Sequence, residues 1–239
     1  MTFDKPIIKS DIENIGYLAP IPIFQKVYTD SNFHDEVYKY GFENLSEQQK
    51  LMGQELPEQY DKERAKLWDV QYLNGMEWVE QTEHNPIGSR FYVPPNNVLD
   101  SDYPGFKEIR KRVIDSYCYL LDNMGIKYKN VQLTESWMQY YPPTEGRGHN
   151  QHNHCRWQPE EYNTLGFSGG YYLSDGDPVK DHPYSGVFTF HIRGFSYFIR
   201  PQKGMLMIWP NDIVHSVKPF YGKTHRCVIN FNIQSERIK

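Results

Sequence analysis

Three histidines and one arginine in the second half of the chain have the residue types of a metal centre that also binds an acid. His152 and His154 are two residues apart, and His215 and Arg226 follow later. Side chains at positions i and i+2 of a β-strand project from the same face, about 6 to 7 Å apart, so His152 and His154 can reach one ion. Three protein ligands would leave about half of an octahedral shell open, as in non-haem Fe(II) oxygenases and unlike closed structural zinc sites.

Arg226 is the candidate for holding an acid beside the metal. A guanidinium binds a carboxylate through two parallel hydrogen bonds and keeps its charge at physiological pH. A two-residue turn at Tyr221 and Gly222 would place Arg226 on the strand opposite His215 and on the same face. The sequence therefore predicts one hairpin that carries both the third histidine and the arginine. A shift of the turn by one residue would move Arg226 to the other face.

The elements that must position these residues differ between the two halves of the chain. Beyond Val131, short apolar segments alternate with glycine and proline, which is typical of an antiparallel sandwich or barrel. Residues 106–124 have apolar side chains at spacings of three and four and charged side chains between them, which predicts an amphipathic helix that packs on a sheet. Segment 21–24 predicts a strand, and its Pro22 favours a sheet edge. Further helical stretches are predicted at residues 47–52 and 58–79.

Six short motifs follow one another between Glu135 and Gln234. They are Glu135-Ser136-Trp137, His152-Asn153-His154, Phe167-Ser168-Gly169-Gly170-Tyr171-Tyr172-Leu173, Gly204-Met205-Leu206-Met207-Ile208-Trp209-Pro210, Ile213-Val214-His215-Ser216-Val217 and Arg226-Cys227-Val228-Ile229-Asn230-Phe231-Asn232. In this order the stretch resembles the iron(II)/2-oxoglutarate-dependent oxygenases of the prolyl-4-hydroxylase-like superfamily. It is most similar to a group of such oxygenases that is frequent in large tailed phages of aquatic bacteria.

The resemblance implies a mainly β fold, a double-stranded β-helix of jelly-roll or cupin-like form, over residues 131–239. Residues 1–130 would add a strand and helices that pack on this core within one compact domain. The implied cofactors are Fe(II), 2-oxoglutarate and O2, with His152 and His215 as iron ligands and Arg226 as the 2-oxoglutarate anchor. The implied reaction is hydroxylation of an unidentified small-molecule or peptide substrate, with release of succinate and CO2.

The chain departs from the pattern of the superfamily at two positions. His154 stands where most members have aspartate or glutamate, so it either completes a three-histidine site or does not bind metal. A neutral imidazole in place of a carboxylate raises the net charge of the site by one unit. Val228 stands where relatives place a hydroxyl that shares the carboxylate with the arginine. Tyr140 or Tyr171 would then be the donor that contacts 2-oxoglutarate.

Composition restricts the class of protein without identifying it. A length of 239 residues with 38% apolar side chains suffices for a packed core. The net charge of −4, without an arginine-rich run, gives no reason to expect nucleic acid as a stable partner. Three cysteines favour a reducing compartment, and no apolar run is long enough for a membrane span. We expect a cytoplasmic protein, in an infected bacterial host if it is a phage protein; the oligomeric state stays open.

Two other classes of protein are compatible with these residues. A cupin-like dioxygenase with a three-histidine metal site would not use 2-oxoglutarate and would not need Arg226. A metal-free β-sandwich that serves as a binding or structural module would need none of the histidines. Ser168 lies in a Gly-x-Ser-x-Gly pattern, but that hydrolase motif requires a following helix, and the sequence predicts a strand and a turn there.

Overall fold

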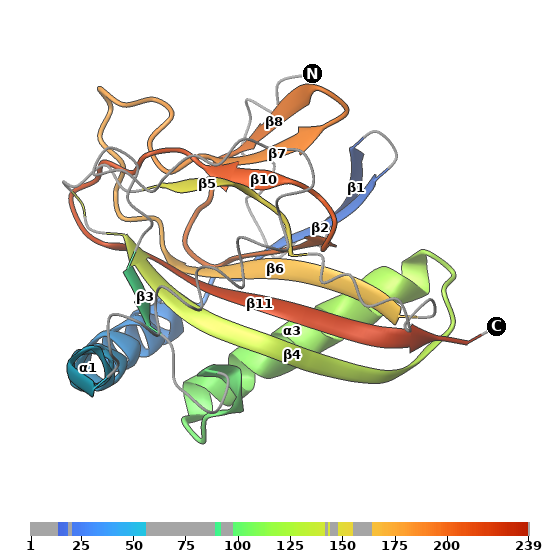
Figure 1. The fold of residues 1–239 in the computed structure, drawn as a ribbon, viewed down its shortest axis with the longest axis horizontal. Coiled ribbons are helices and arrows are strands. Elements are labelled where there is room, and N and C mark those ends of the chain that lie inside the picture. Colours follow the sequence, from blue (N-terminus) through green and yellow to red (C-terminus); the bar gives the residue numbers. More distant parts are fainter. Residues whose placement is uncertain are drawn as a thin grey trace.

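The computed structural model describes residues 14–18, 21–55, 89–91, 98–141, 143, 148–154 and 164–238. Within these residues, the strands form two antiparallel sheets that face each other, and two α-helices cover the outer face of the larger sheet (Figure 1). The protein is therefore mainly β with a helical layer on one side, as the sequence predicts.

The larger sheet has seven strands in the order β1-β2-β9-β6-β11-β4-β3. Its strands are β1 (Asn14–Leu18), β2 (Ile21–Val27), β3 (Ser89–Phe91), β4 (Tyr128–Tyr141), β6 (Thr164–Ser174), β9 (Met205–Pro210) and β11 (Arg226–Arg237). The smaller sheet has four strands in the order β5-β10-β7-β8. These are β5 (His149–His152), β7 (Phe188–Ile192), β8 (Phe195–Ile199) and β10 (His215–Val217).

The two faces of the larger sheet are distinguished most clearly along β11. Ile229 and Phe231 belong to the buried cluster shared with the helices. Val228 belongs to a second buried cluster, which includes Phe190 of the smaller sheet. Successive side chains of a strand point to opposite faces, so the even-numbered positions from Arg226 onward face the smaller sheet.

The helical layer consists of α1 (Ser31–Glu55) and α3 (Pro104–Asn123), with the short 3-10 helix η1 (Val98–Asp100) before α3. Helix α3 confirms the amphipathic helix predicted at residues 106–124. Its proline lies in the first turn, where a missing backbone N–H breaks no helical hydrogen bond. Helix α1 includes the predicted stretch 47–52 but begins much earlier. The helix predicted at 58–79 lies outside the described residues.

Two sequence-based expectations about strands are wrong. Strand β2 is internal, between β1 and β9, whereas Pro22 had favoured an edge. Pro22 lies opposite Tyr17 of β1, but the pairing with β9 begins only at Phe24. Pro22 is tolerated because no residue of β9 is paired with it, so that side of the strand behaves like an edge at this position. The predicted hairpin between His215 and Arg226 does not form either, because β10 pairs with β5 and β7 and β11 pairs with β4 and β6. Arg226 therefore lies on the opposite sheet from His215.

Among the described helices, none combines the length and the apolar composition that a bilayer crossing requires.

Candidate metal centre

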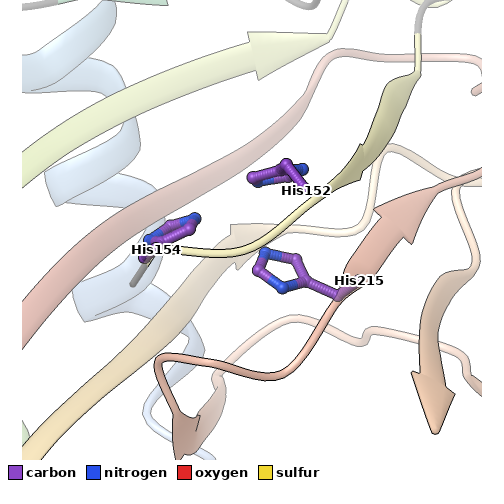
Figure 2. A group of neighbouring side chains, drawn as sticks. All are labelled: His152, His154 and His215. Atoms are coloured by element: carbon purple, nitrogen blue, oxygen red, sulfur yellow. The ribbon is translucent and has the colours of Figure 1, made fainter. Parts of the chain in front are cut away.

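His152, His154 and His215 converge at the end of the short strand β5. The register of β5 and β10 places His215 opposite His152, and His154 follows two residues after the strand. The ring centroids of His152 and His215 are 4.3 Å apart, and that of His154 lies 5.1 and 5.0 Å from the other two. One nitrogen of each ring lies within 4.8 Å of the others, and Figure 2 shows the rings turned toward a common space. The structure thus brings together the three histidines that the sequence singles out.

Hydrogen bonds determine which ring nitrogen is available on two of these histidines. Nδ1 of His215 lies 2.9 Å from the carbonyl oxygen of Ile213. A carbonyl oxygen only accepts, so Nδ1 of His215 carries the proton and Nε2 keeps its lone pair. Nδ1 of His154 lies 2.7 Å from Oδ1 of Asn232, which gives His154 the same tautomer. A protonated outer nitrogen bonded to the protein is the usual arrangement of a metal-binding histidine.

His215 is the most enclosed of the three histidines. It is 3% exposed, and burial, with smaller contributions from the neighbouring His154 and His191, lowers its pKa to about 3. Its ring centroid lies 5.2 Å from that of Phe188 and 5.1 Å from that of Trp209. The imidazole is therefore neutral at physiological pH, as a metal ligand must be, and aromatic side chains keep water from this side of the cluster.

Arg226 is a buried cation without a matching anion among the residues that the structure describes. It is 2% exposed, and its Cζ lies 4.7 Å from the ring centroid of Tyr141 and 5.2 Å from that of Tyr172. Its Nε and Nη1 atoms are buried without a hydrogen-bond partner, and no carboxylate of the described residues forms an ion pair with it. An uncompensated buried charge is costly. The unused N–H groups of Arg226 could bind a carboxylate ligand.

Tyr140 and Tyr171, proposed from the sequence as cofactor contacts, lie on the other face of the larger sheet. The hydroxyl of Tyr140 donates to the carbonyl oxygen of Tyr38 at 2.9 Å. The hydroxyl of Tyr171 lies 2.9 Å from Nε2 of His34 and accepts from Nη1 of Arg112 at 2.7 Å. All of these partners belong to the helices, so the structure does not bring either tyrosine to Arg226.

Tyr141 and Tyr172, and not Tyr140 and Tyr171, lie beside Arg226. Each is one residue further along its strand and therefore points into the space between the sheets. Burial raises the pKa of Tyr172 to about 12, although the nearby Arg226 guanidinium lowers it. The phenol is thus a neutral donor. The alternation of apolar Ile229, Phe231 and Ile233 with polar Asn230, Asn232 and Gln234 on β11 is the signal that distinguishes the two faces.

No protein-family model and no curated protein matches the chain. Among solved structures, the chain is similar to a prolyl-4-hydroxylase from Pseudomonas putida, with a TM-score of 0.52 at 13% identity over 93% of this chain and 96% of that one. AviO1 from Streptomyces viridochromogenes Tue57 follows with a TM-score of 0.45 at 13% identity, over 72% of this chain and 81% of that one. The viral collagen prolyl hydroxylase vCPH from Paramecium Bursaria Chlorella virus-1 has a TM-score of 0.44 at 13% identity, over 62% and 80%.

The structure therefore has the fold of a prolyl-4-hydroxylase. This confirms, at the level of the fold, the resemblance to the prolyl-4-hydroxylase-like superfamily that the sequence motifs indicate. At such low identity the likeness concerns the fold alone, so the chemistry has to be argued from the residues of this chain.

Proposed function

We propose that this protein is an Fe(II)- and 2-oxoglutarate-dependent dioxygenase that hydroxylates its substrate and releases succinate and CO2. The observation that carries the proposal is the combination of three converging imidazoles with a buried arginine that has unused N–H groups. Imidazole nitrogens suit iron, and a buried guanidinium suits the far carboxylate of a dicarboxylic acid. Both features lie on the inner side of one β-sandwich.

We also propose that strands β4 to β11 form a double-stranded β-helix. Strands β4, β6, β9 and β11 belong to the larger sheet, and β5, β7, β8 and β10 belong to the smaller one. The chain thus passes repeatedly between the sheets, and the orders β4-β11-β6-β9 and β5-β10-β7-β8 support a jelly-roll winding. The division of the chain into a supporting segment 1–130 and a core 131–239 stays a prediction.

In the proposed enzyme, His152, His154 and His215 hold Fe(II), and Arg226 with the Tyr172 phenol binds the far carboxylate of 2-oxoglutarate. Iron with 2-oxoglutarate and O2 supplies the oxidising chemistry, which belongs to the cofactors. The contribution of the protein is to fix the ligands, to hold the acid in one orientation and to keep the site dry. The substrate is a small molecule or a peptide, and a prolyl peptide is the first to test because a prolyl-4-hydroxylase has the same fold.

Turnover of 2-oxoglutarate tests the proposal. Protein purified without oxygen is mixed with Fe(II) and 2-oxoglutarate, its visible spectrum is recorded, and succinate is measured after O2 is admitted, with and without prolyl peptides. We expect a visible charge-transfer band from chelated Fe(II) and succinate that requires both iron and O2. Absence of the band together with absence of succinate would contradict the proposal.

The donor set favours one further candidate function. Three imidazoles without a carboxylate also characterise cupin-type dioxygenases that use no keto acid, and within the described residues the cluster consists of three histidines. Such an enzyme would bind Fe(II) as well, but 2-oxoglutarate would not change the spectrum of the bound iron. The same anaerobic titration therefore separates the two candidates.

A further inference from the structure

A short chain of hydrogen bonds leads from His154 into the larger sheet. Oδ1 of Asn232 on β11 lies 2.7 Å from Nδ1 of His154 and also accepts from Oγ of Ser168 on β6 at 2.8 Å. Nδ2 of the same Asn232 donates to Oε2 of Glu135 on β4 at 3.1 Å. Asn232 is paired in register with both Glu135 and Ser168. All three side chains that support His154 thus come from adjacent, directly paired positions of one rigid sheet.

The chemistry of Glu135 determines the direction of every bond in this chain. A carboxylate only accepts hydrogen bonds, so it must face the NH2 group of the Asn232 amide. The amide oxygen then faces His154 and Ser168, and it can accept from both through its two lone pairs. His154 must donate from Nδ1, which leaves Nε2 as its only nitrogen for a metal. The carboxylate of Glu135 therefore determines the tautomer of His154 through two successive hydrogen bonds.

Glu135 also brings a negative charge close to the histidine cluster. It is 8% exposed, and Ser168 is fully buried. Water therefore screens this charge only weakly. Hydrogen-bonded partners behind a metal-binding histidine fix its orientation and raise the basicity of the ligand. The charge lies outside the three-imidazole set, which itself carries none.

We propose that Asn232, held in place by Glu135, is a positioning residue that orients His154 as a metal ligand. Glu135 does not bind the metal, but it supplies near the site the negative charge that a directly bound carboxylate ligand would bring. This inference rests on the proposed metal centre and deepens it. Of the two alternatives that the sequence leaves open, it favours the one in which His154 completes a three-histidine site.

Metal affinity, measured without turnover, tests this inference. Co(II) is titrated into the metal-free protein by calorimetry, and the visible d–d spectrum of bound Co(II) reports the number and type of ligands. We expect Asn232→Ala to weaken Co(II) binding by about 10- to 100-fold and to change the spectrum. Asn230→Ala is the matched control, because Asn230 is the next inward-facing residue of β11 and bonds to Gln139 instead of His154; it should leave both readouts unchanged.

Two conservative variants separate orientation from charge. The double variant Asn232→Asp with Glu135→Gln exchanges the amide and the carboxylate: the new amide at 135 donates to the new carboxylate at 232, which still accepts from Nδ1 of His154, so the wild-type spectrum should be retained. Glu135→Gln keeps an acceptor for the amide of Asn232 but removes the charge, so it should keep the spectrum and weaken binding by several-fold to about 10-fold. Glu135→Gln preserves the shape of the side chain, so it still tests the charge if Asn232→Ala does not fold. In that case Asn232→Leu, which has nearly the same shape and offers no acceptor to His154, tests the positioning role.

The possible failures are distinguishable. If the wild-type protein binds no Co(II), the proposed metal centre itself is wrong. If the wild-type protein binds Co(II) and Asn232→Ala binds it as well as Asn230→Ala does, only the positioning role is overturned. If Glu135→Gln binds Co(II) as tightly as the wild type, the role of the charge is overturned. Thermal unfolding of each metal-free variant shows whether a loss of affinity reflects a loss of fold.

Discussion

At the scale of single residues, the three histidines and Arg226 are suited to ligands of opposite charge. The histidines offer ring nitrogens to a cation, whereas Arg226 offers unused N–H groups to an anion. Because the two groups lie on different sheets, each can be removed with little effect on the other. Substitutions at this scale therefore separate metal binding from acid binding.

Arg226→Met should abolish tight binding of 2-oxoglutarate while leaving metal affinity unchanged. Hydrogen bonds to charged groups contribute roughly 1.5 to 3 kcal/mol each, so loss of the guanidinium should weaken 2-oxoglutarate binding by at least about 10²-fold. Methionine keeps much of the side-chain volume. The measurement is calorimetric titration of 2-oxoglutarate into Co(II)-loaded protein, with Co(II) affinity as the control. Unchanged 2-oxoglutarate affinity would favour the keto-acid-independent dioxygenase.

His215→Ala should remove metal binding, because it deletes the ligand that comes from the second strand. We expect Co(II) affinity to fall by at least about 10²-fold, since ligand number and geometry determine the affinity of such sites. His182→Ala is the matched control. His182 is exposed, stacks on Tyr221 with ring centroids 4.3 Å apart, and is not a member of the histidine cluster. Equal metal affinity of the two variants would exclude His215 as a ligand.

The sequence predicts which residues form the candidate site better than it predicts the face of the strand on which each side chain lies. The spacing of His152 and His154 is local, so their shared orientation followed from the geometry of an extended chain. Adjacent tyrosines look alike in sequence, so no local signal distinguishes Tyr140 and Tyr171 from Tyr141 and Tyr172. Which of the two faces inward depends on strand pairing across the sheet, and a single residue of register exchanges them.

At the scale of elements, helix α3 supports the face of the sheet that lies opposite the site. Ile109 and Val113 are fully buried in the cluster that also contains Ile229 and Phe231 of β11. Strand β11 thus has the site on one face and the helices on the other. The packing of α3 contributes to stability and to the rigidity of the sheet that carries Asn232 and Arg226.

Ile109→Ala should destabilise the protein without altering the metal site. Truncation of a fully buried isoleucine costs about 2 to 5 kcal/mol. Lys111→Ala on the same helix is the control, because its ion pair with Asp115 is exposed to solvent and should contribute little to stability. Urea unfolding measures the free energy of unfolding, and Co(II) titration under native conditions measures the metal affinity of the site. Equal stability of both variants would show that α3 does not pack as described.

The helix at residues 106–124 and the run of strands beyond Val131 could be predicted from the sequence, but one important strand pairing could not. The pattern of residues 106–124 is a strong local signal, and α3 confirms it. The predicted hairpin of His215 and Arg226 assumed that neighbouring strands pair with each other. In this sandwich the chain crosses between the sheets at that point, and the partners of β11 are the distant strands β4 and β6. Such long-range pairing leaves no signal in local spacing.

At the scale of the whole molecule, the metal-free protein carries buried neutral histidines. His34 of α1 is 1% exposed and bonds to Tyr171 in the layer between the helices and the sheet. Burial is the main cause that lowers the pKa of His34 to about 4, although Asp30 opposes the shift. His215 is similarly buried, between the two sheets, so both histidines must gain a proton when the protein unfolds in acid.

The stability of the metal-free protein should fall as the pH is lowered from about 6.5 to 4. In this window the unfolded chain binds protons that the folded chain does not. Each buried histidine therefore lowers the free energy of unfolding by up to about 1.4 kcal/mol per pH unit. Below pH 4, His34 adds no further loss. Urea unfolding of the wild type and of His34→Gln at pH 7 and pH 5 checks this expectation. The variant should lose less stability between these values, on the order of 1 kcal/mol; parallel losses would mean that His34 is not buried neutral.

The central claim is that three imidazoles bind one iron while Arg226 holds the far carboxylate of 2-oxoglutarate. The most direct test is a crystal structure of the protein grown without oxygen in Fe(II) and 2-oxoglutarate, with anomalous scattering recorded at the iron edge. We expect a single iron peak at about 2.1 Å from one nitrogen each of His152, His154 and His215, and a carboxylate against Arg226. An iron peak elsewhere, or 2-oxoglutarate bound away from Arg226, would contradict the claim.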